Sequence, residues 1–94
     1  MGRIRIIKRS NDVSAADFPK GKVIFHTRTH TPYILNGTAS AIWDFCETPK
    51  GVINVIEYIK RTYGVKDARA KRDVEAFVSE MKKRNVIRLI WTKR

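Results

Sequence analysis

Three side chains in this 94-residue chain could in principle support metal or nucleophilic chemistry: His26, His30 and Cys46. A zinc site needs three or four such ligands around one centre. The two histidines flank a predicted turn instead of sharing a helix face, and Cys46 falls in an apolar stripe that suits a small core residue. We therefore predict two surface turn histidines, a buried cysteine and no metal site.

The patterns of the common enzyme classes are missing from the sequence. It has no glycine-rich phosphate loop, no nucleophile elbow and no paired catalytic carboxylates. Its length suits one small domain, which we expect to cover residues 1–94 with a core over about 12–88. The sequence therefore predicts a protein that binds a partner, without a cofactor, and not an enzyme.

The charge balance predicts that this partner is anionic. Twenty Lys and Arg against nine Asp and Glu give a formal net charge of +11, and a surplus of this size attracts anions. The cations are uneven, since none lies between His30 and Pro49 while residues 60–84 carry nine. A single cysteine and the lack of an apolar run of about 18 residues predict a cytoplasmic protein with no membrane span.

Several strands are expected from composition and period-two alternation. Residues 22–26 and 32–35 are rich in β-branched and aromatic residues and read as the two arms of a hairpin. Because Pro32 lacks an N–H, the second arm is expected on a sheet edge. Residues 3–8 alternate as a strand or a flexible arm, and the apolar run 86–91 reads as a final strand or a docked tail.

Three helices are expected from apolar periodicity and from residues that favour helix ends. They are predicted over 37–47, 52–63 and 67–84, with Asn36, Gly51 and Asp67 as N-terminal caps and Gly64 and Asn85 as stops. Strands followed by helices and a possible C-terminal strand predict an α+β fold that is winged-helix-like. Leu35 and Trp43 are expected in its core.

Two readings of the binding surface follow. The third helix carries Lys71, Arg72, Lys82, Lys83 and Arg84, which could lie on the phosphates of a nucleic acid. However, acidic residues are interleaved with these cations, and no Asn or Gln is present on the helix to read bases. The alternative for this helix is a solvated face with ion pairs between residues four apart.

The second reading starts from the strand at 32–35. If it is an outer strand, its unpaired N–H and C=O groups form a template onto which an extended peptide adds as one more strand. The third helix beside it would supply an apolar groove, with lysines for acidic peptide residues. Equally, the rest of the chain could cover this edge.

The segment YILNGTASAIWDFCETPKGVINVIEYIKRTYGV, followed by KRDVEAFVSEMKKRNVI, resembles the PqqD family, named for pyrroloquinoline quinone biosynthesis. The resemblance covers about residues 22–88 and rests on the corner formed by Tyr33, Leu35, Asn36, Thr38, Ala39, Ile42 and Trp43. It implies an N-terminal antiparallel three-stranded sheet, a three-helix bundle and a non-catalytic role. Such proteins bind the leader of a ribosomally made precursor peptide and present it to a modifying enzyme, often a radical S-adenosylmethionine enzyme.

The resemblance also implies a binding site, in which the leader adds to the last strand of the sheet in a cleft against the third helix. In this sequence that site comprises Pro32, Tyr33, Ile34 and Leu35 on the strand and Lys71, Val74, Glu75, Val78 and Lys82 on the helix. Alternation predicts that Tyr33 and Leu35 point inward and Ile34 outward. A monomer and a strand-exchanged dimer both remain possible. The basic ends, RIRIIKRS and LIWTKR, lie outside the shared pattern and leave room for nucleic acid, a membrane surface or an acidic enzyme.

Overall fold

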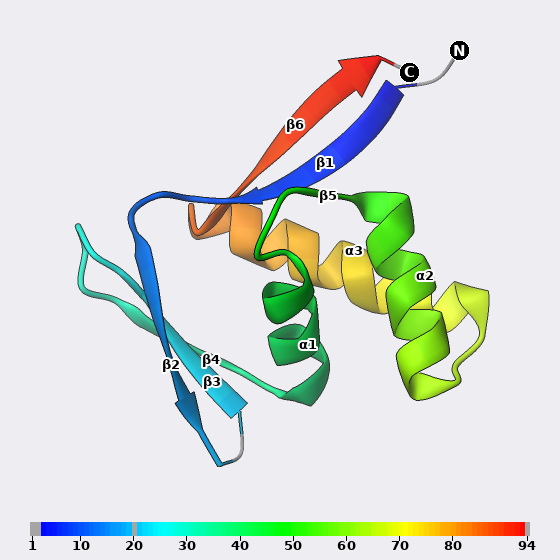
Figure 1. The fold of residues 1–94 in the computed structure, drawn as a ribbon. Helices are drawn as coiled ribbons and strands as arrows, with labels where there is room; N and C mark the ends of the chain where they lie inside the picture. The colour runs from blue at the N-terminus through cyan, green and yellow to red at the C-terminus, as the bar shows by residue number, and fades with distance from the viewer. Residues whose placement is uncertain (1–2, 20, 94) are drawn as a thin grey trace.

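The computed structural model describes residues 3–19 and 21–93, so residues 1, 2, 20 and 94 of the expected domain lie outside the described residues. Its elements, in chain order, are β1 (Arg3–Arg9), β2 (Val13–Phe18), β3 (Gly21–His26), β4 (Pro32–Leu35), α1 (Gly37–Phe45), β5 (Lys50–Gly51), α2 (Val52–Tyr63), α3 (Asp67–Lys83) and β6 (Ile87–Lys93). The strands form two small sheets that lie beside the three helices, as can be followed in Figure 1. The predicted α+β class is confirmed.

The first sheet has the strand order β2–β3–β4, with both pairings antiparallel. β4 therefore forms an edge, as Pro32 predicts. The predicted hairpin of residues 22–26 and 32–35 is confirmed, whereas the sequence predicts no strand at β2. The sequence VSAADF has no apolar alternation because nearly all of β2 is exposed, so no period-two signal marks it.

The second sheet has the order β5–β1–β6 and joins the two ends of the chain. β1 and β6 pair antiparallel over seven residues, from Arg3 opposite Lys93 to Arg9 opposite Ile87. The two open expectations for residues 3–8 and 86–91 are therefore both settled as strands. The two-residue strand β5 was not predicted, because a piece this short carries no periodicity.

The core lies between the helices and the inner faces of both sheets. It includes Leu35 from β4, Trp43 from α1, Val74 and Val78 from α3, and Ile7 from β1. Leu35 and Trp43 are each 2% exposed, which confirms their expected place in the core. In the described part of the chain, no helix is long and apolar enough to span a bilayer.

The helix ends follow the capping residues closely. The side chain of Asn36 accepts a hydrogen bond from the Ala39 N–H at 3.0 Å, and Gly64 ends α2 in the left-handed conformation, as predicted. Asn85 also has a positive φ of 62° and follows Arg84, the C-cap of α3. The expected cap at Asp67 is wrong by one residue, since Lys66 precedes the helix and Asp67 lies in its first turn.

The C-terminus of α3 turns directly into β6. The Val86 N–H donates to the Met81 carbonyl at 3.1 Å and the Asn85 N–H donates to the Lys82 carbonyl at 3.1 Å. This pair of bonds is the Schellman arrangement, in which a left-handed residue satisfies the last helical carbonyls. Val86 and Met81 are both buried, so the turn fixes the angle at which β6 leaves the helix.

Candidate functional site

The outer edge of β4 presents free main-chain groups. The His26 N–H donates to the Thr31 carbonyl at 3.4 Å, and the register continues with Ile24 opposite Tyr33. Because hydrogen-bonded and non-hydrogen-bonded pairs alternate in an antiparallel ladder, Tyr33 bonds β3 while the N–H and C=O of Ile34 point away. Within the described residues no backbone group meets them. The open edge that the sequence left undecided is therefore present.

Side chains along β4 alternate as predicted. Leu35 is buried and Tyr33 is half-buried against the core, whereas the Ile34 side chain is 83% exposed on the outer face. Ile34 thus offers both its main chain and an apolar side chain to an added strand. This is the largest exposure among the exposed large apolar side chains of the described residues.

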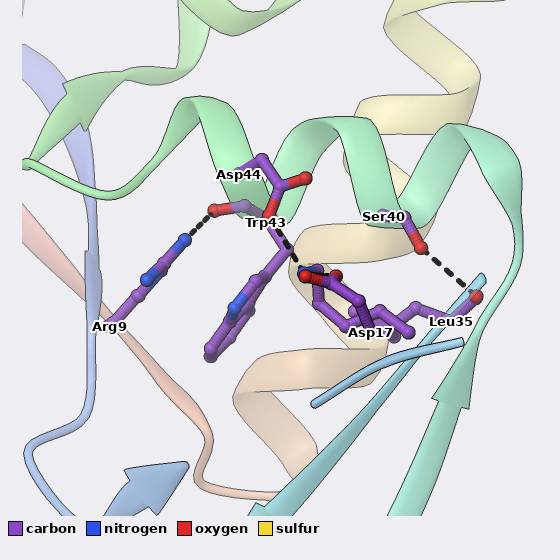
Figure 2. Close-up of polar contacts among 7 residues, drawn as sticks. Arg9, Asp17, Leu35, Ser40, Trp43 and Asp44 are labelled. Carbon is purple, nitrogen blue, oxygen red and sulfur yellow. Dashed lines mark hydrogen bonds and ion pairs between the residues drawn. The ribbon is translucent and has the colours of Figure 1, made fainter. Parts of the chain in front are cut away.

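A tight corner fixes the end of β4. The Ser40 hydroxyl, on α1, donates to the Leu35 carbonyl at 3.1 Å, as Figure 2 shows. On the other side of that carbonyl lies Gly21, where a Cβ atom would sit only 2.4 Å from the oxygen. Gly21 also has a φ of +155°, a backbone angle that residues with a side chain rarely adopt. The corner therefore requires a residue without a side chain.

Two cations hold α1 between the sheets. Buried Lys22, on β3, pairs with Asp17 of β2 and with Asp44 of α1, the latter at 3.1 Å. The hydrogen bond with Asp17 raises the pKa of Lys22, against an opposing effect of burial. Arg9 of β1 lies 4.5 Å from the centre of the Trp43 ring and donates to the Trp43 carbonyl (Figure 2). Because β2, β3 and β1 are all tied to α1, the β4 edge is held at a fixed distance from the helices.

A cleft runs between β4 and α3, and its first half is apolar. This half is a depression of about 450 Å³. Its apolar lining comes from β4, α1 and α3 and consists of Ile34, Leu35, Ala39, Ile42, Ala76, Phe77 and Met81. Arg69, Asp73 and Glu80 form part of its rim. A side chain from an added strand could be buried here.

The second half of the cleft is basic. It is a depression of about 900 Å³ at the Tyr33 end of β4, and Glu80 borders both halves. Its cations are Arg28, Lys83, Arg84 and Arg88. The Arg84 guanidinium lies 4.6 Å from the centre of the Tyr33 ring and pairs with Glu80. The cleft therefore changes from apolar to cationic along its length.

The helix residues expected in this cleft lie on another side of α3. Val74 and Val78 are buried in the core. Glu75 accepts a hydrogen bond from Arg5 of β1 at 2.9 Å, and this bond is the main cause of the lowered pKa of Glu75. The charge of exposed Lys71 adds a smaller effect in the same direction. Glu75, Val78 and Lys82 border a separate depression with Arg5 and Leu89. None of the five lines either half of the cleft beside β4, so their part in peptide binding stays a prediction from the sequence.

The helix residues that do face β4 were not assigned to the peptide site from the sequence, although Arg84 was named as a possible phosphate contact. Ala76, Phe77, Glu80, Met81 and Arg84 line the two halves of the cleft. An apolar stripe on a helix has a flank on either side, and periodicity alone does not tell which flank meets a given strand. Arg84 lies at the predicted end of this helix, but its cation–π contact with Tyr33 depends on how α3 packs beside β4.

His26, His30 and Cys46, the side chains considered for metal or nucleophilic chemistry, do not form a common site. His26 is buried, contrary to the expectation of a surface residue, and its Nδ1 accepts the Arg28 N–H at 3.3 Å. His30 is exposed in the turn, as expected. Cys46 is buried, as predicted, and its burial raises the pKa of the thiol to about 11, so it stays protonated at neutral pH. No cluster of three metal-binding side chains occurs among residues 3–19 and 21–93.

Comparison with known proteins agrees with this architecture. Residues 21–87 match the family described as Coenzyme PQQ synthesis protein D (PqqD). A solved structure of TbiB1 in complex with the TbiA(beta) leader peptide superposes with a TM-score of 0.78 at 25% identity, covering 85% of this chain and 93% of that one. Lasso peptide synthetase B1 complexed with the leader peptide has the same fold, with a TM-score of 0.73 at 22% identity over 87% of this chain and 96% of that one.

No curated protein matches the chain. The family match covers β3 to α3 and thus both walls of the cleft, together with the Ser40 and Gly21 corner. It therefore includes every element that creates the open β4 edge. On this match the chain belongs to the PqqD family.

Proposed function

We propose that this protein is a non-catalytic module that binds the leader segment of a ribosomally made precursor peptide as an extra strand on β4. It then presents the peptide to a modifying enzyme, such as a radical S-adenosylmethionine enzyme, in the cytoplasm. The observation that carries the proposal is the free Ile34 main chain beside a cleft that is ready to take side chains. The leader-bound structures of similar fold support it.

Main-chain bonds alone give only part of the affinity. β4 is four residues long, and Pro32 has no N–H, so the edge offers the N–H and C=O of Ile34 and the C=O of Pro32. Each such bond contributes roughly 1 kcal/mol net. Burying one large apolar side chain in the cleft adds about 2 kcal/mol. We infer that the leader carries an apolar residue at the position facing Leu35 and Phe77.

The two halves of the cleft predict the order of residue types in a leader that pairs antiparallel to β4. The apolar half adjoins Ile34 and Leu35, and the basic half adjoins Tyr33. A strand that runs antiparallel to β4 therefore places its earlier residues in the apolar half and its later residues near Arg84 and Arg28. The favoured ligand has an apolar residue followed by acidic ones.

In this proposal the strand residues Pro32, Tyr33, Ile34 and Leu35 keep the role that the sequence predicted. The helix wall changes to Ala76, Phe77, Glu80, Met81 and Arg84. The protein acts as a monomer, because a strand-exchanged dimer that paired two β4 strands would occupy the same edge as the leader.

The test measures the affinity of a synthetic leader, taken from a precursor encoded beside this protein, by isothermal titration calorimetry. Single N-methyl groups are placed in turn along the leader. Methylation of an amide that faces β4 should weaken binding about tenfold, since it removes one bond and adds a clash, whereas methylation of the adjacent amides should have little effect. An equal effect at every position would rule out strand addition.

The protein side is tested with Ile34→Pro, which removes the outward N–H. We expect about a tenfold weaker affinity with an unchanged far-ultraviolet circular dichroism spectrum. Ile53→Ala, at an exposed apolar residue of α2, is the control and should bind as wild type. Wild-type affinity in a folded Ile34→Pro variant would contradict the proposed role of β4.

A further inference from the structure

The ribbon formed by β1 and β6 lies largely outside the region that matches the family. Its two seven-residue strands, RIRIIKR and IRLIWTK, hold six Lys or Arg and no Asp or Glu. Figure 1 shows the far end of this ribbon standing away from the three helices. The fold thus joins two basic segments from opposite ends of the sequence into one surface.

Pairing these strands brings like charges together. Lys8 lies directly opposite Arg88 in the ladder, and like charges in this position destabilise a sheet. No carboxylate pairs with Arg3, Lys8 or Arg88 among the described residues. An arrangement that costs stability in the free protein would be relieved by a bound anion.

An aromatic ring accompanies these cations. Trp91 is 53% exposed, and the guanidinium carbons of Arg3 and Arg5 lie 5.8 and 6.0 Å from its ring centre. Arg5 is also fixed by its bonds to Glu75. A ring held at the surface between arginines is suited to stacking on a flat aromatic group, as in proteins that bind single-stranded nucleic acids.

The distribution of cations over both faces of the ribbon favours a flexible partner. Register places Arg3, Arg5 and Trp91 on one face of the ribbon and Lys8 and Arg88 on the other. A flat protein surface would reach one face at a time, whereas a flexible polyanion can reach both. We propose that the β1–β6 ribbon binds single-stranded nucleic acid, with bases stacking on Trp91 and phosphates meeting the cations of both faces.

The third helix, which the sequence suggested as a nucleic-acid surface, is less suitable. Its cations alternate with acids and pair with them, as in Arg69 with Asp73 at 3.8 Å and Arg84 with Glu80. Several of them also border the cleft proposed for the leader. The ribbon is independent of that cleft apart from Arg88 and Ile87.

The test titrates the full chain with a fluorescent oligothymidylate of roughly 16 nucleotides, at several salt concentrations. Arg3→Gln/Lys8→Gln removes two ribbon cations that do not border the cleft. We expect about tenfold weaker binding at low salt and a log–log salt slope shallower by about 1.4, at about 0.7 per lost phosphate contact. Lys71→Gln/Arg72→Gln on α3 removes the same charge and should change affinity less than about twofold.

Tryptophan fluorescence gives a second readout. Trp43 is buried, so quenching by the oligonucleotide should come from Trp91 and disappear in Trp91→Phe. Equal losses in the two double variants, or no binding at low salt, would overturn the proposal. Binding of poly-glutamate with the same affinity and the same quenching would also overturn it, because it would show a general anion surface. Each result is independent of leader binding.

Discussion

The molecule has two sheets with open edges, and they differ in what surrounds them. The β4 edge borders an apolar depression and its own strand, PYIL, carries no charged residue, whereas the β6 edge belongs to a ribbon with six cations. Natural proteins commonly protect exposed edges with charged residues. By this measure the β6 edge is protected against stray strand pairing, and the β4 edge is left open to it.

The two sheets also differ in how they are attached. The β4 end is fixed by main-chain geometry at Gly21 and by Ser40. The ribbon is anchored at one end by buried Ile7 and Ile87, and further out Arg5 pairs with Glu75 of α3, where both side chains are about one-third exposed. A recognition edge needs a fixed backbone, since its hydrogen bonds require a defined geometry. A surface that meets a flexible polyanion does not.

Of the variants that test how β4 is fixed, Gly21→Ala is expected to have the largest effect on stability. The added Cβ would lie 2.4 Å from the Leu35 carbonyl oxygen, and the backbone has a φ of +155°, so the variant should lose roughly 2–3 kcal/mol of unfolding free energy. Urea denaturation measures this loss. Leader affinity should fall as well, because the end of β4 moves.

Gly37→Ala is the matched control for this variant. Nothing lies within 4 Å of a Cβ at Gly37, which occupies the first turn of α1. We expect unchanged or slightly higher stability, by up to about 1 kcal/mol, since alanine reduces the entropy of the unfolded chain. Equal losses in both variants would mean that the corner at Leu35 is not what fixes β4.

The next largest effect is on leader affinity, and it distinguishes the two flanks of α3. Ala76→Glu places a carboxylate in the apolar half of the cleft and should weaken leader binding at least about tenfold, because burying an unpaired charge is costly. Ser79→Glu makes the same addition on the flank that borders the Arg5 depression and should leave affinity unchanged. Calorimetry with both variants decides which flank faces the leader, and a larger loss in Ser79→Glu would contradict the cleft described above.

Local signals in the sequence were sufficient for much of the fold. Asn36, Gly64 and Asn85 each act through the backbone of their own turn, so their type alone indicates where a helix begins or ends. Tyr33, Ile34 and Leu35 alternate as expected because a strand fixes side-chain direction residue by residue. The directions of the β4 side chains were therefore predictable, and their role in peptide binding stays a prediction.

The rest depends on contacts between distant residues. Nothing in RIRIIKR indicates that its partner is IRLIWTK, more than 75 residues later, and β2 carries no apolar pattern. The apolar stripe of α3 fixed Val74 and Val78 in the core, but the choice between Glu75 and Ala76 as neighbours of β4 is made by tertiary packing. The helix residues that line the cleft beside β4 therefore differ from those that the sequence suggested.

The smallest effect concerns the attachment of the ribbon and depends on pH. The hydrogen bond from Arg5 lowers the pKa of Glu75, with burial acting in the opposite direction. A depressed pKa in the folded state adds stability above the unfolded carboxyl pKa of about 4.3, and this stability is lost as pH falls through the folded value. Glu75→Gln should therefore cost stability at pH 7 and nothing at the acid end.

Because both partners are partly exposed, solvent screens the pair, and the expected difference at pH 7 is only about 0.5 kcal/mol. Urea denaturation of wild type and Glu75→Gln, at intervals from neutral to acidic pH, should give two curves that converge on acidification. The control is Glu57→Gln on α2, away from β1. Its stability curve should run parallel to the wild-type curve. A constant gap between the wild-type and Glu75→Gln curves at every pH would show that the ribbon is held to α3 by packing at Leu89 and Ile87, with the ion pair contributing nothing.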